Sequence, residues 1–236
     1  RDVLGSRGLG DVYKRQRLRR GLFWFYLERV PKVPEISEEK GCPLVHMPYS
    51  AIKDCAFRII VYENRVAVEI FHALTDGTGG LIFLKTLLAE YISRKYSVKV
   101  PATQGVLGRL EEPSEEELED SFLKYAGKVS ASRKEADAYQ MKGTREKDGF
   151  VHLTTMMLDT AAVKARAKEL SVTVTELICA AMAEAILRQQ TEKGSRRDRK
   201  KPVKVLVPVN LRGLFPSRTL RNFCLLYTSD AADDLT

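Results

Sequence analysis

The stretch FRIIVYENRVAVEIFHALTDGTGGLIFLKTLLAEYISRKY, residues 57–96, carries the clearest fold signals of the 236-residue chain. Two runs rich in β-branched residues flank Glu63 and Asn64, and apolar residues alternate in the second run, which predicts a β-hairpin over 57–72. Apolar residues recur at helical spacing over 80–96, which predicts an amphipathic helix. We expect its buried stripe to consist of Leu81, Leu84, Leu87, Leu88 and Tyr91.

The segment that joins this hairpin to the helix carries candidate catalytic residues. His72 ends the second strand, and Asp76 and Gly77 follow in the loop. A neutral imidazole can take a proton from a hydroxyl or an amine near pH 7. Asp76 lies too close along the chain to orient the ring, so we expect it to turn away and form an ion pair. The glycines at 77, 79 and 80 allow a sharp turn and let a substrate approach main-chain N–H groups.

The pattern H-x-x-x-D-G is moderately specific by itself, and two interpretations of His72 stay open on the residues alone. It is either a general base or a structural histidine. We expect His46 and His152, which have no comparable surroundings, to be structural.

The two ends of the chain resemble translated sequencing adapters of the transposase type. One DNA spelling of DVYKRQ, residues 11–16, is GATGTGTATAAGAGACAG, and its reverse complement read one base out of frame encodes CLLYTS, residues 224–229. We therefore exclude 1–16 and 224–236 from fold reasoning and expect the remainder to be a piece of a longer protein. The alternative is a pair of natural tails.

The rest of the chain divides into a polar middle and a second structured part. Residues 97–149 are polar, with one short helix predicted after Ser114, where Glu115, Glu116 and Glu117 suit a helix start. Residues 150–223 follow as a strand at 150–159, a helix at 160–171, a long buried helix at 173–190 and a strand at 203–212. A capping box of Thr173 and Glu176 is predicted at the start of the long helix.

Composition indicates an ordinary soluble globular chain, with 44% hydrophobic and 30% charged residues and a formal charge of +8. Basic residues cluster only at 193–201, which we interpret as a solvated loop and not as a nucleic-acid site. No apolar run is long enough to span a membrane. The cysteines have no metal-like spacing, so we expect no metal, and reduced thiols in a cytoplasmic protein.

Hairpin, HALTDGTGG and helix together resemble the coenzyme A-dependent acyltransferase superfamily, in which H-x-x-x-D-G marks this strand, loop and helix. This superfamily includes chloramphenicol acetyltransferase, the plant BAHD enzymes, alcohol acetyltransferases and peptide-synthetase condensation domains. A second similarity lies at VPVNLRGLFPSRTLRNF, residues 207–223, where these families place an arginine and later an asparagine. The closest likeness is to bacterial alcohol acetyltransferase-like proteins, and it covers 17–223.

The resemblance implies a fold and a set of roles. The fold would be α/β, an α+β two-layer sandwich of two lobes, with a first lobe at 17–96, a linker or surface insertion at 97–149 and an incomplete second lobe at 150–223. His72 would be the general base and the N–H of Gly77 an oxyanion donor. Asp76 would pair with Arg212, and Asn222 would match the later asparagine.

The implied reaction moves an acyl group, typically acetyl, from acyl-CoA to a small hydroxyl or amine acceptor, with no covalent acyl-enzyme and no permanently bound cofactor. Two alternatives stay open. One is a condensation-type domain that uses thioesters bound to an acyl carrier protein. The other is a non-catalytic module that docks such a carrier through its positive charge.

Overall fold

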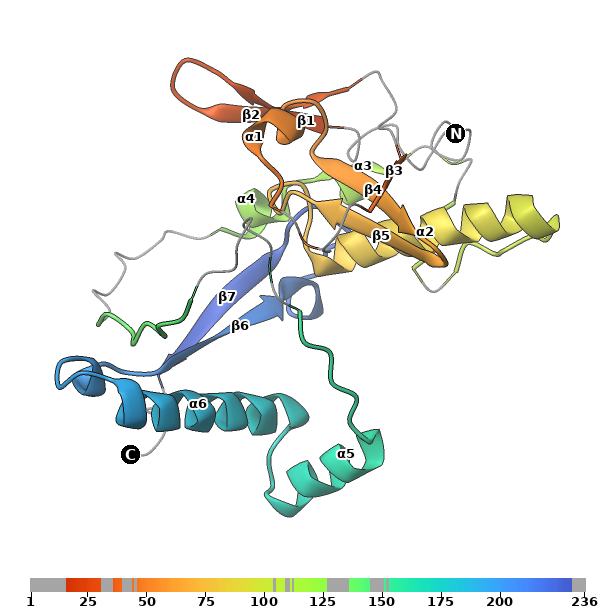
Figure 1. Cartoon of the computed structure of the whole chain (residues 1–236). Coiled ribbons are helices and arrows are strands. Elements are labelled where there is room, and N and C mark those ends of the chain that lie inside the picture. Colours follow the sequence, from red (N-terminus) through yellow and green to blue (C-terminus); the bar gives the residue numbers. More distant parts are fainter. Residues whose placement is uncertain are drawn as a thin grey trace. The chain divides into compact units, whose positions relative to one another are not determined.

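The computed structural model describes residues 16–30, 36–39, 44, 46–103, 105–108, 111, 113–126, 136–144, 151 and 153–230. Helices and strands are both present throughout, which confirms the α+β class (Figure 1). The chain forms two compact units. Unit 1 consists of Arg1–Gly127, Asp148–Val151 and Asn210–Cys224, and unit 2 of Lys128–Lys147, His152–Val209 and Leu225–Thr236.

Unit 1 holds two small sheets and the long helix that follows the hairpin (Figure 1). One sheet is the antiparallel pair β1–β2, and the other has the order β3-β4-β5, with β3 parallel and β5 antiparallel to β4. The elements are β1 (Gln16–Arg20), β2 (Phe25–Arg29), β3 (Ile36–Glu38), α1 (Tyr49–Ile52), β4 (Phe57–Tyr62), β5 (Arg65–Ile70), α2 (Gly77–Tyr96), α3 (Glu115–Leu118), α4 (Ser121–Tyr125) and the 3-10 turn η4 (Leu211–Gly213).

The hairpin predicted from 57–72 is confirmed as β4 and β5, which run from the pair Phe57 and Ile70 to the pair Tyr62 and Arg65. Glu63 takes the left-handed conformation that such a two-residue turn requires, with φ of 47°. Residues 17–29 contribute to both strands of the β1–β2 pair, because the chain turns back at Gly21.

Helix α2 packs on the β4–β5 hairpin and closes the core of unit 1. The rings of Phe57 on β4 and Phe83 on α2 meet edge to face, with centroids 5.3 Å apart. Ile59, Leu74 and Leu87 complete the centre of this buried cluster. The predicted stripe is wrong in part, since Leu81, Leu88 and Tyr91 are exposed. The spacing of apolar residues is compatible with either of two overlapping faces of the helix being buried. The buried face is the one with Phe83 and Leu87, because Phe83 contacts Phe57.

Part of the expected polar linker belongs to unit 1. The helix predicted after Ser114 is α3, and its capping box joins the side chains of Ser114 and Glu117 to each other's backbone N–H. The backbone N–H of Leu220 donates to the carbonyl of Glu117, and the Thr219 hydroxyl donates to the carbonyl of Glu119. Residues 114–126 therefore pack against 215–223, and both segments lie in unit 1.

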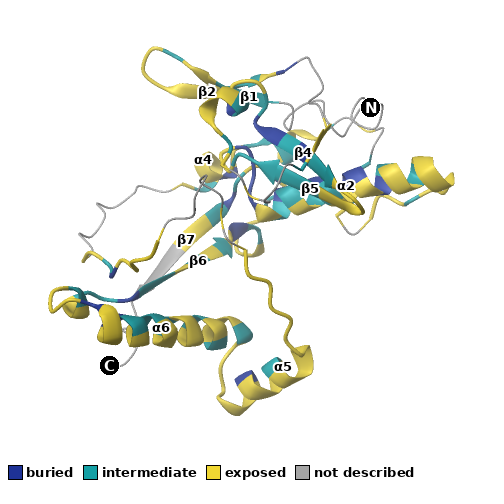
Figure 2. Ribbon diagram, in the orientation of Figure 1, coloured by how far each residue is buried: buried dark blue, intermediate teal, exposed yellow. Residues whose placement is uncertain are grey.

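Unit 2 contains the predicted helices, but they are largely exposed (Figure 2). Its elements are α5 (Thr160–Glu169), α6 (Val174–Lys193), the 3-10 turn η3 (Asp198–Lys200), β6 (Lys204–Asn210) and β7 (Cys224–Asp230). The capping box of Thr173 and Glu176 is present. The expectation that 173–190 is buried is wrong, because Gln190 is the one buried residue of α6 and its apolar side chains have little to pack on within the described residues of unit 2.

Two further expectations for this part of the chain are corrected. Residues 153–159 are extended and exposed instead of a strand, because no described strand pairs with them, while 150 and 152 lie outside the described residues. Residues 224–230, excluded above from the fold, form β7 and pair with β6, as their apolar composition permits.

The basic segment 193–201 is ordered around Asp198. The Ser195 hydroxyl donates to the Asp198 carboxylate at 2.8 Å and the Lys142 ammonium at 3.1 Å. These two contacts lower the pKa of Asp198 to about 2. The Arg199 Nε also donates to the carbonyl of Gly194 at 3.1 Å, so side-chain hydrogen bonds help to hold this segment.

In the described part of the chain, no single helix has the length and apolar character needed to cross a membrane. Helices α5 and α6 have that length and apolar character only when they are taken together, as a pair bent by 85°.

Replacing Phe83 with Ala should lower the free energy of unfolding of unit 1 by about 3–5 kcal/mol, because the change removes a buried ring and leaves a cavity beside Phe57. Urea denaturation followed by circular dichroism measures the loss. The control is Leu81→Ala on the same helix, where the side chain is 52% exposed and we expect a change below about 1 kcal/mol. Equal losses for the two variants would contradict the assigned face of α2.

Candidate active site

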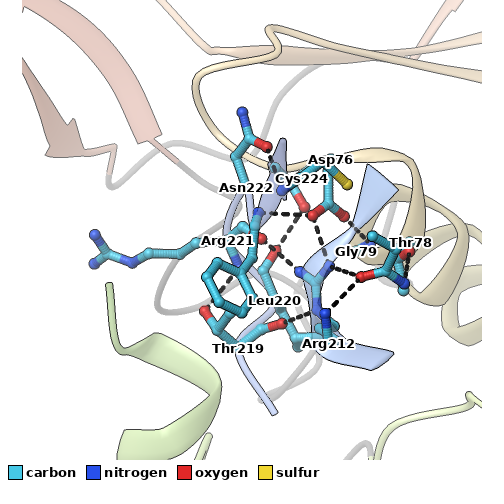
Figure 3. A network of polar contacts seen from close by, with 12 residues as sticks. Asp76, Thr78, Gly79, Arg212, Thr219, Leu220, Arg221, Asn222 and Cys224 are labelled. Carbon is cyan, nitrogen blue, oxygen red and sulfur yellow. Dashed lines mark hydrogen bonds and ion pairs between the residues drawn. The ribbon is translucent and has the colours of Figure 1, made fainter. Parts of the chain in front are cut away.

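The carboxylate of Asp76 is the centre of a polar network in unit 1 (Figure 3). Asp76 is the N-cap of α2, and its Oδ1 accepts a hydrogen bond from the backbone N–H of Gly79 at 3.0 Å. Its Oδ2 accepts from the Arg212 guanidinium at 2.7 Å and from the backbone N–H of Phe223 at 2.8 Å. One buried side chain therefore joins the start of α2 to two segments more than 130 residues away in sequence.

Arg212 reaches the carboxylate from the η4 turn and uses its remaining donors on the loop that follows (Figure 3). Its Nε donates to the carbonyl of Thr219 at 2.9 Å, and its Nη2 donates to the carbonyl of Arg221 at 2.6 Å. The Asn210 side chain accepts a further bond from Nη1 at 3.2 Å. The expected ion pair between Asp76 and Arg212 is therefore present, and the planar guanidinium also fixes the shape of 219–221.

The charge of Asp76 is well compensated. Burial by itself would raise the pKa of Asp76, but the N–H groups of Phe223 and Gly79 and the Arg212 guanidinium together hold it below its ordinary value. Asp76 is therefore ionised at neutral pH. Burial raises the pKa of the neighbouring Cys224 thiol, and the Asp76 carboxylate adds to that effect.

Of the glycines in this loop, Gly79 is required by a close contact and Gly77 is not. A Cβ atom on Gly79 would collide with the Thr75 side chain and with the backbone carbonyl of Leu220, which the Thr75 hydroxyl binds at 2.6 Å. A Cβ atom on Gly77 would meet nothing within 4 Å. Gly77 is the first residue of α2 and is exposed, and its backbone N–H has no hydrogen-bond partner among the described residues.

His72 lies in the turn after β5 and is exposed, so its imidazole is available to a ligand. Its Nδ1 lies 3.3 Å from the side-chain amide nitrogen of Asn222. The structure thus brings together His72 and Asn222, two of the residues expected at the site, from segments 150 residues apart. Asp76 makes its contacts elsewhere, as expected from the shortness of the loop.

A pocket of about 590 Å³ borders the turn that carries His72. Phe71 and Ala73, the two neighbours of His72 in sequence, line it. Leu18 on β1 and residues 25–27 on β2 also line it, so the short β1–β2 hairpin helps to form the space beside this turn.

Sequence reasoning missed the supports of this site. Thr75 and Thr219 are buried polar residues whose hydroxyl groups hold the carbonyls of Leu220 and Glu119. Their only sequence signal was a threonine next to Asp76 and another in the loop after Arg212. In the described residues, no group of three or more His, Cys, Asp or Glu side chains is placed to bind a metal ion.

No family model matches this chain, and no curated protein matches it. Among solved structures, polyketide synthase associated protein 5 from Mycobacterium tuberculosis is similar with a TM-score of 0.54 and 13% identity, over 97% of this chain and 58% of that chain. The SgcC5 protein from Streptomyces globisporus, in complex with (R)-(-)-1-(2-naphthyl)-1,2-ethanediol and sucrose, has a TM-score of 0.46 and 14% identity, over 97% of this chain and 56% of that chain.

The similarity to polyketide synthase associated protein 5 shows a shared fold. The chain spans little more than half the length of both of these structures.

Gly79→Ala should destabilise unit 1 by about 1–3 kcal/mol, because the new methyl group has to displace the backbone at Leu220. Gly77→Ala is the matched control and should be neutral or stabilising by up to about 1 kcal/mol, since its methyl group enters open space. Thermal unfolding of the two variants measures both effects. A stable Gly79→Ala variant would show that α2 does not approach Leu220 this closely.

Asp76→Asn should cost about 3 kcal/mol at pH 7, because it leaves the Arg212 guanidinium partly buried without its counter-charge. The pKa of Asp76 is lower in the folded chain than in the unfolded one, so its contribution to stability is present above the unfolded value of about 4 and is lost as the pH falls through the folded value. Urea midpoints of wild type and variant should therefore converge below about pH 4. The control is Asp54→Asn, at an exposed position. Its urea midpoint should differ from that of wild type by a small amount that is nearly the same at each pH.

Proposed function

We propose that this chain is part of an acyltransferase that moves an acyl group from coenzyme A to a hydroxyl or amine acceptor, with His72 as general base. One observation carries the proposal. Asp76 is fully engaged with Gly79, Arg212 and Phe223, while His72, four residues earlier, is exposed beside a pocket. This division of roles within H-x-x-x-D-G suits a histidine that acts on a substrate and an aspartate that supports its loop.

The proposed reaction is a direct transfer. His72 takes the proton from the acceptor oxygen or nitrogen as that atom forms a bond to the thioester carbonyl carbon. The carbonyl oxygen then carries a negative charge. The N–H of Gly77, which has no partner among the described residues, is a local donor of the kind such an oxyanion needs. Collapse of the intermediate breaks the carbon–sulfur bond, and the proton on His72 passes to the coenzyme A thiolate. General-base assistance of this kind contributes about 10²–10⁴-fold to a rate.

Asn222 is a positioning residue in this scheme. A base that acts through Nε2 needs its proton on Nδ1, and therefore needs an acceptor beside Nδ1. In the structure the amide nitrogen of Asn222 faces Nδ1 and its oxygen accepts from the backbone N–H of Cys224 at 3.4 Å. The Asn222 oxygen supplies the acceptor after a 180° rotation of the amide group, which exchanges the bond to Cys224 for one to the ring. The reaction would take place in the cytoplasm, the compartment expected from the spacing of the cysteines in the sequence.

His72→Ala should lower kcat/KM for acyl transfer by at least about 10²-fold without changing the melting temperature, because the imidazole is exposed and its removal leaves the Asp76 network intact. Release of the coenzyme A thiol, measured with a disulfide reagent and several hydroxyl and amine acceptors, gives the rate. The control is His46→Ala, an exposed histidine in a separate segment, which should keep full activity.

Retained turnover in His72→Ala would show that His72 is not the general base and would refute the proposed mechanism. A chain that transfers acyl groups only from a carrier-bound thioester would favour the condensation-type reaction over the use of free acyl-CoA. Binding to an acyl carrier protein without any turnover would instead favour a docking module.

A further inference from the structure

The pocket beside His72 carries an unused positive charge at Arg221. This side chain lines the pocket and extends away from the Asp76 network (Figure 3). Its backbone is fixed, since its carbonyl accepts from Arg212 and its N–H donates to the Thr219 hydroxyl. Its guanidinium forms neither an ion pair nor a hydrogen bond with any described residue. A fixed backbone that presents a free guanidinium to a pocket is suited to bind an anionic group.

Apart from Gln16, Asp120 and Arg221, the residues that line the pocket are aromatic or apolar. Phe25 and Tyr26 on β2 are 57% and 45% exposed, so their rings offer surface to a ligand, and Phe71 adds a third ring next to His72. Exposed aromatic rings that line a concave space favour stacking with a planar ligand. The pocket therefore combines exposed aromatic rings with a guanidinium that has no partner among the described residues.

Among the described residues, Asp120 is the one carboxylate that lines this pocket, and it also caps a helix. It is the N-cap of α4, and its Oδ1 accepts from the backbone N–H groups of Phe122 at 3.1 Å and Leu123 at 3.3 Å. The charges of Arg221 and Asp120 are therefore not equally available to a ligand. Arg221 has free donors to offer, whereas one oxygen of Asp120 is occupied by the helix.

We propose that the pocket binds the acyl acceptor, and that this acceptor is a planar aromatic hydroxy or amino compound with a carboxylate, held by Arg221. The assignment of the ligand as acceptor rests on the proposed function. Phe71 and Ala73, the neighbours of His72 in sequence, line the pocket, and Arg221 is adjacent to Asn222, which contacts the His72 ring. A carboxylate on Arg221 with a ring against Phe25 and Tyr26 leaves the other end of the ligand free for the turn that carries the base.

Three probes of one shape test the charge preference directly. They are 4-hydroxyphenylacetate, its neutral amide and tyramine, which differ in charge at one end of the same phenol. Dissociation constants from ligand-detected NMR with the full 236-residue chain do not depend on turnover. We expect the anion to bind about tenfold more tightly than the amide, and tyramine to bind no better than the amide, because charge-assisted hydrogen bonds to a guanidinium exceed those to a neutral group.

Arg221→Ala should remove the advantage of the anion and leave the affinity for the amide unchanged. Arg221→Lys should restore part of it, since the charge returns without the fork of donors. Asp120→Asn should strengthen the binding of the anion, because asparagine keeps the cap of α4 while the repelling charge is lost. Arg218→Ala is the matched control from the same loop, since Arg218 is not part of the pocket and faces Glu116 at 3.8 Å.

Equal affinities for the three probes, tightest binding of tyramine, or an Arg221→Ala variant that loses the anion and the amide alike would overturn the assignment. Acyl transfer assays separate it from the proposed function. Selective binding of the anion with no turnover of any acceptor would leave the anion site in place and refute its role in acyl transfer. Turnover of the acid and the amide at equal rates, unchanged in Arg221→Ala, would keep the acyltransferase and refute the acceptor assigned here.

Discussion

The buried carboxylate of Asp76 is the interaction on which the organisation of unit 1 depends. A buried charge is tolerated only when nearby donors compensate the loss of water, and here those donors come from three places in the sequence. Gly79 belongs to the same loop, Arg212 to the η4 turn and Phe223 to the segment just before β7. Because these groups meet at one side chain, the start of α2 and the residues around 210–224 hold one another in place.

The same arrangement explains how a short motif serves two purposes. His72 and Asp76 are only four residues apart in the sequence, yet His72 is exposed and Asp76 is buried. Arg212 draws the carboxylate away from the ring and, through the carbonyl of Arg221, also sets the backbone beside Asn222. Support of the loop and contact with the histidine are thus linked through one guanidinium. A change at Arg212 would therefore alter the surroundings of His72 without direct contact between the two residues.

Much of this site could be anticipated, although by different routes. The separation of Asp76 from His72 follows from the length of the loop, which is too short to fold a carboxylate back onto the ring. The partnership of Asp76 with Arg212 came from the family resemblance, because spacing along the chain cannot identify a contact over 136 residues. The need for glycine at 79 came from neither, since it depends on the carbonyl of Leu220, which only the folded chain brings near.

The sequence by itself determined the local structure of this protein: the hairpin at 57–72, helix α2, the two capping boxes and the loop that separates His72 from Asp76. These features rest on turn geometry and on hydrogen bonds within a few residues. The tertiary structure alone decided which face of α2 is buried, why 153–159 forms no strand, and that 210–224 joins unit 1. Burial and strand pairing depend on what lies opposite an element, and that partner is distant in sequence.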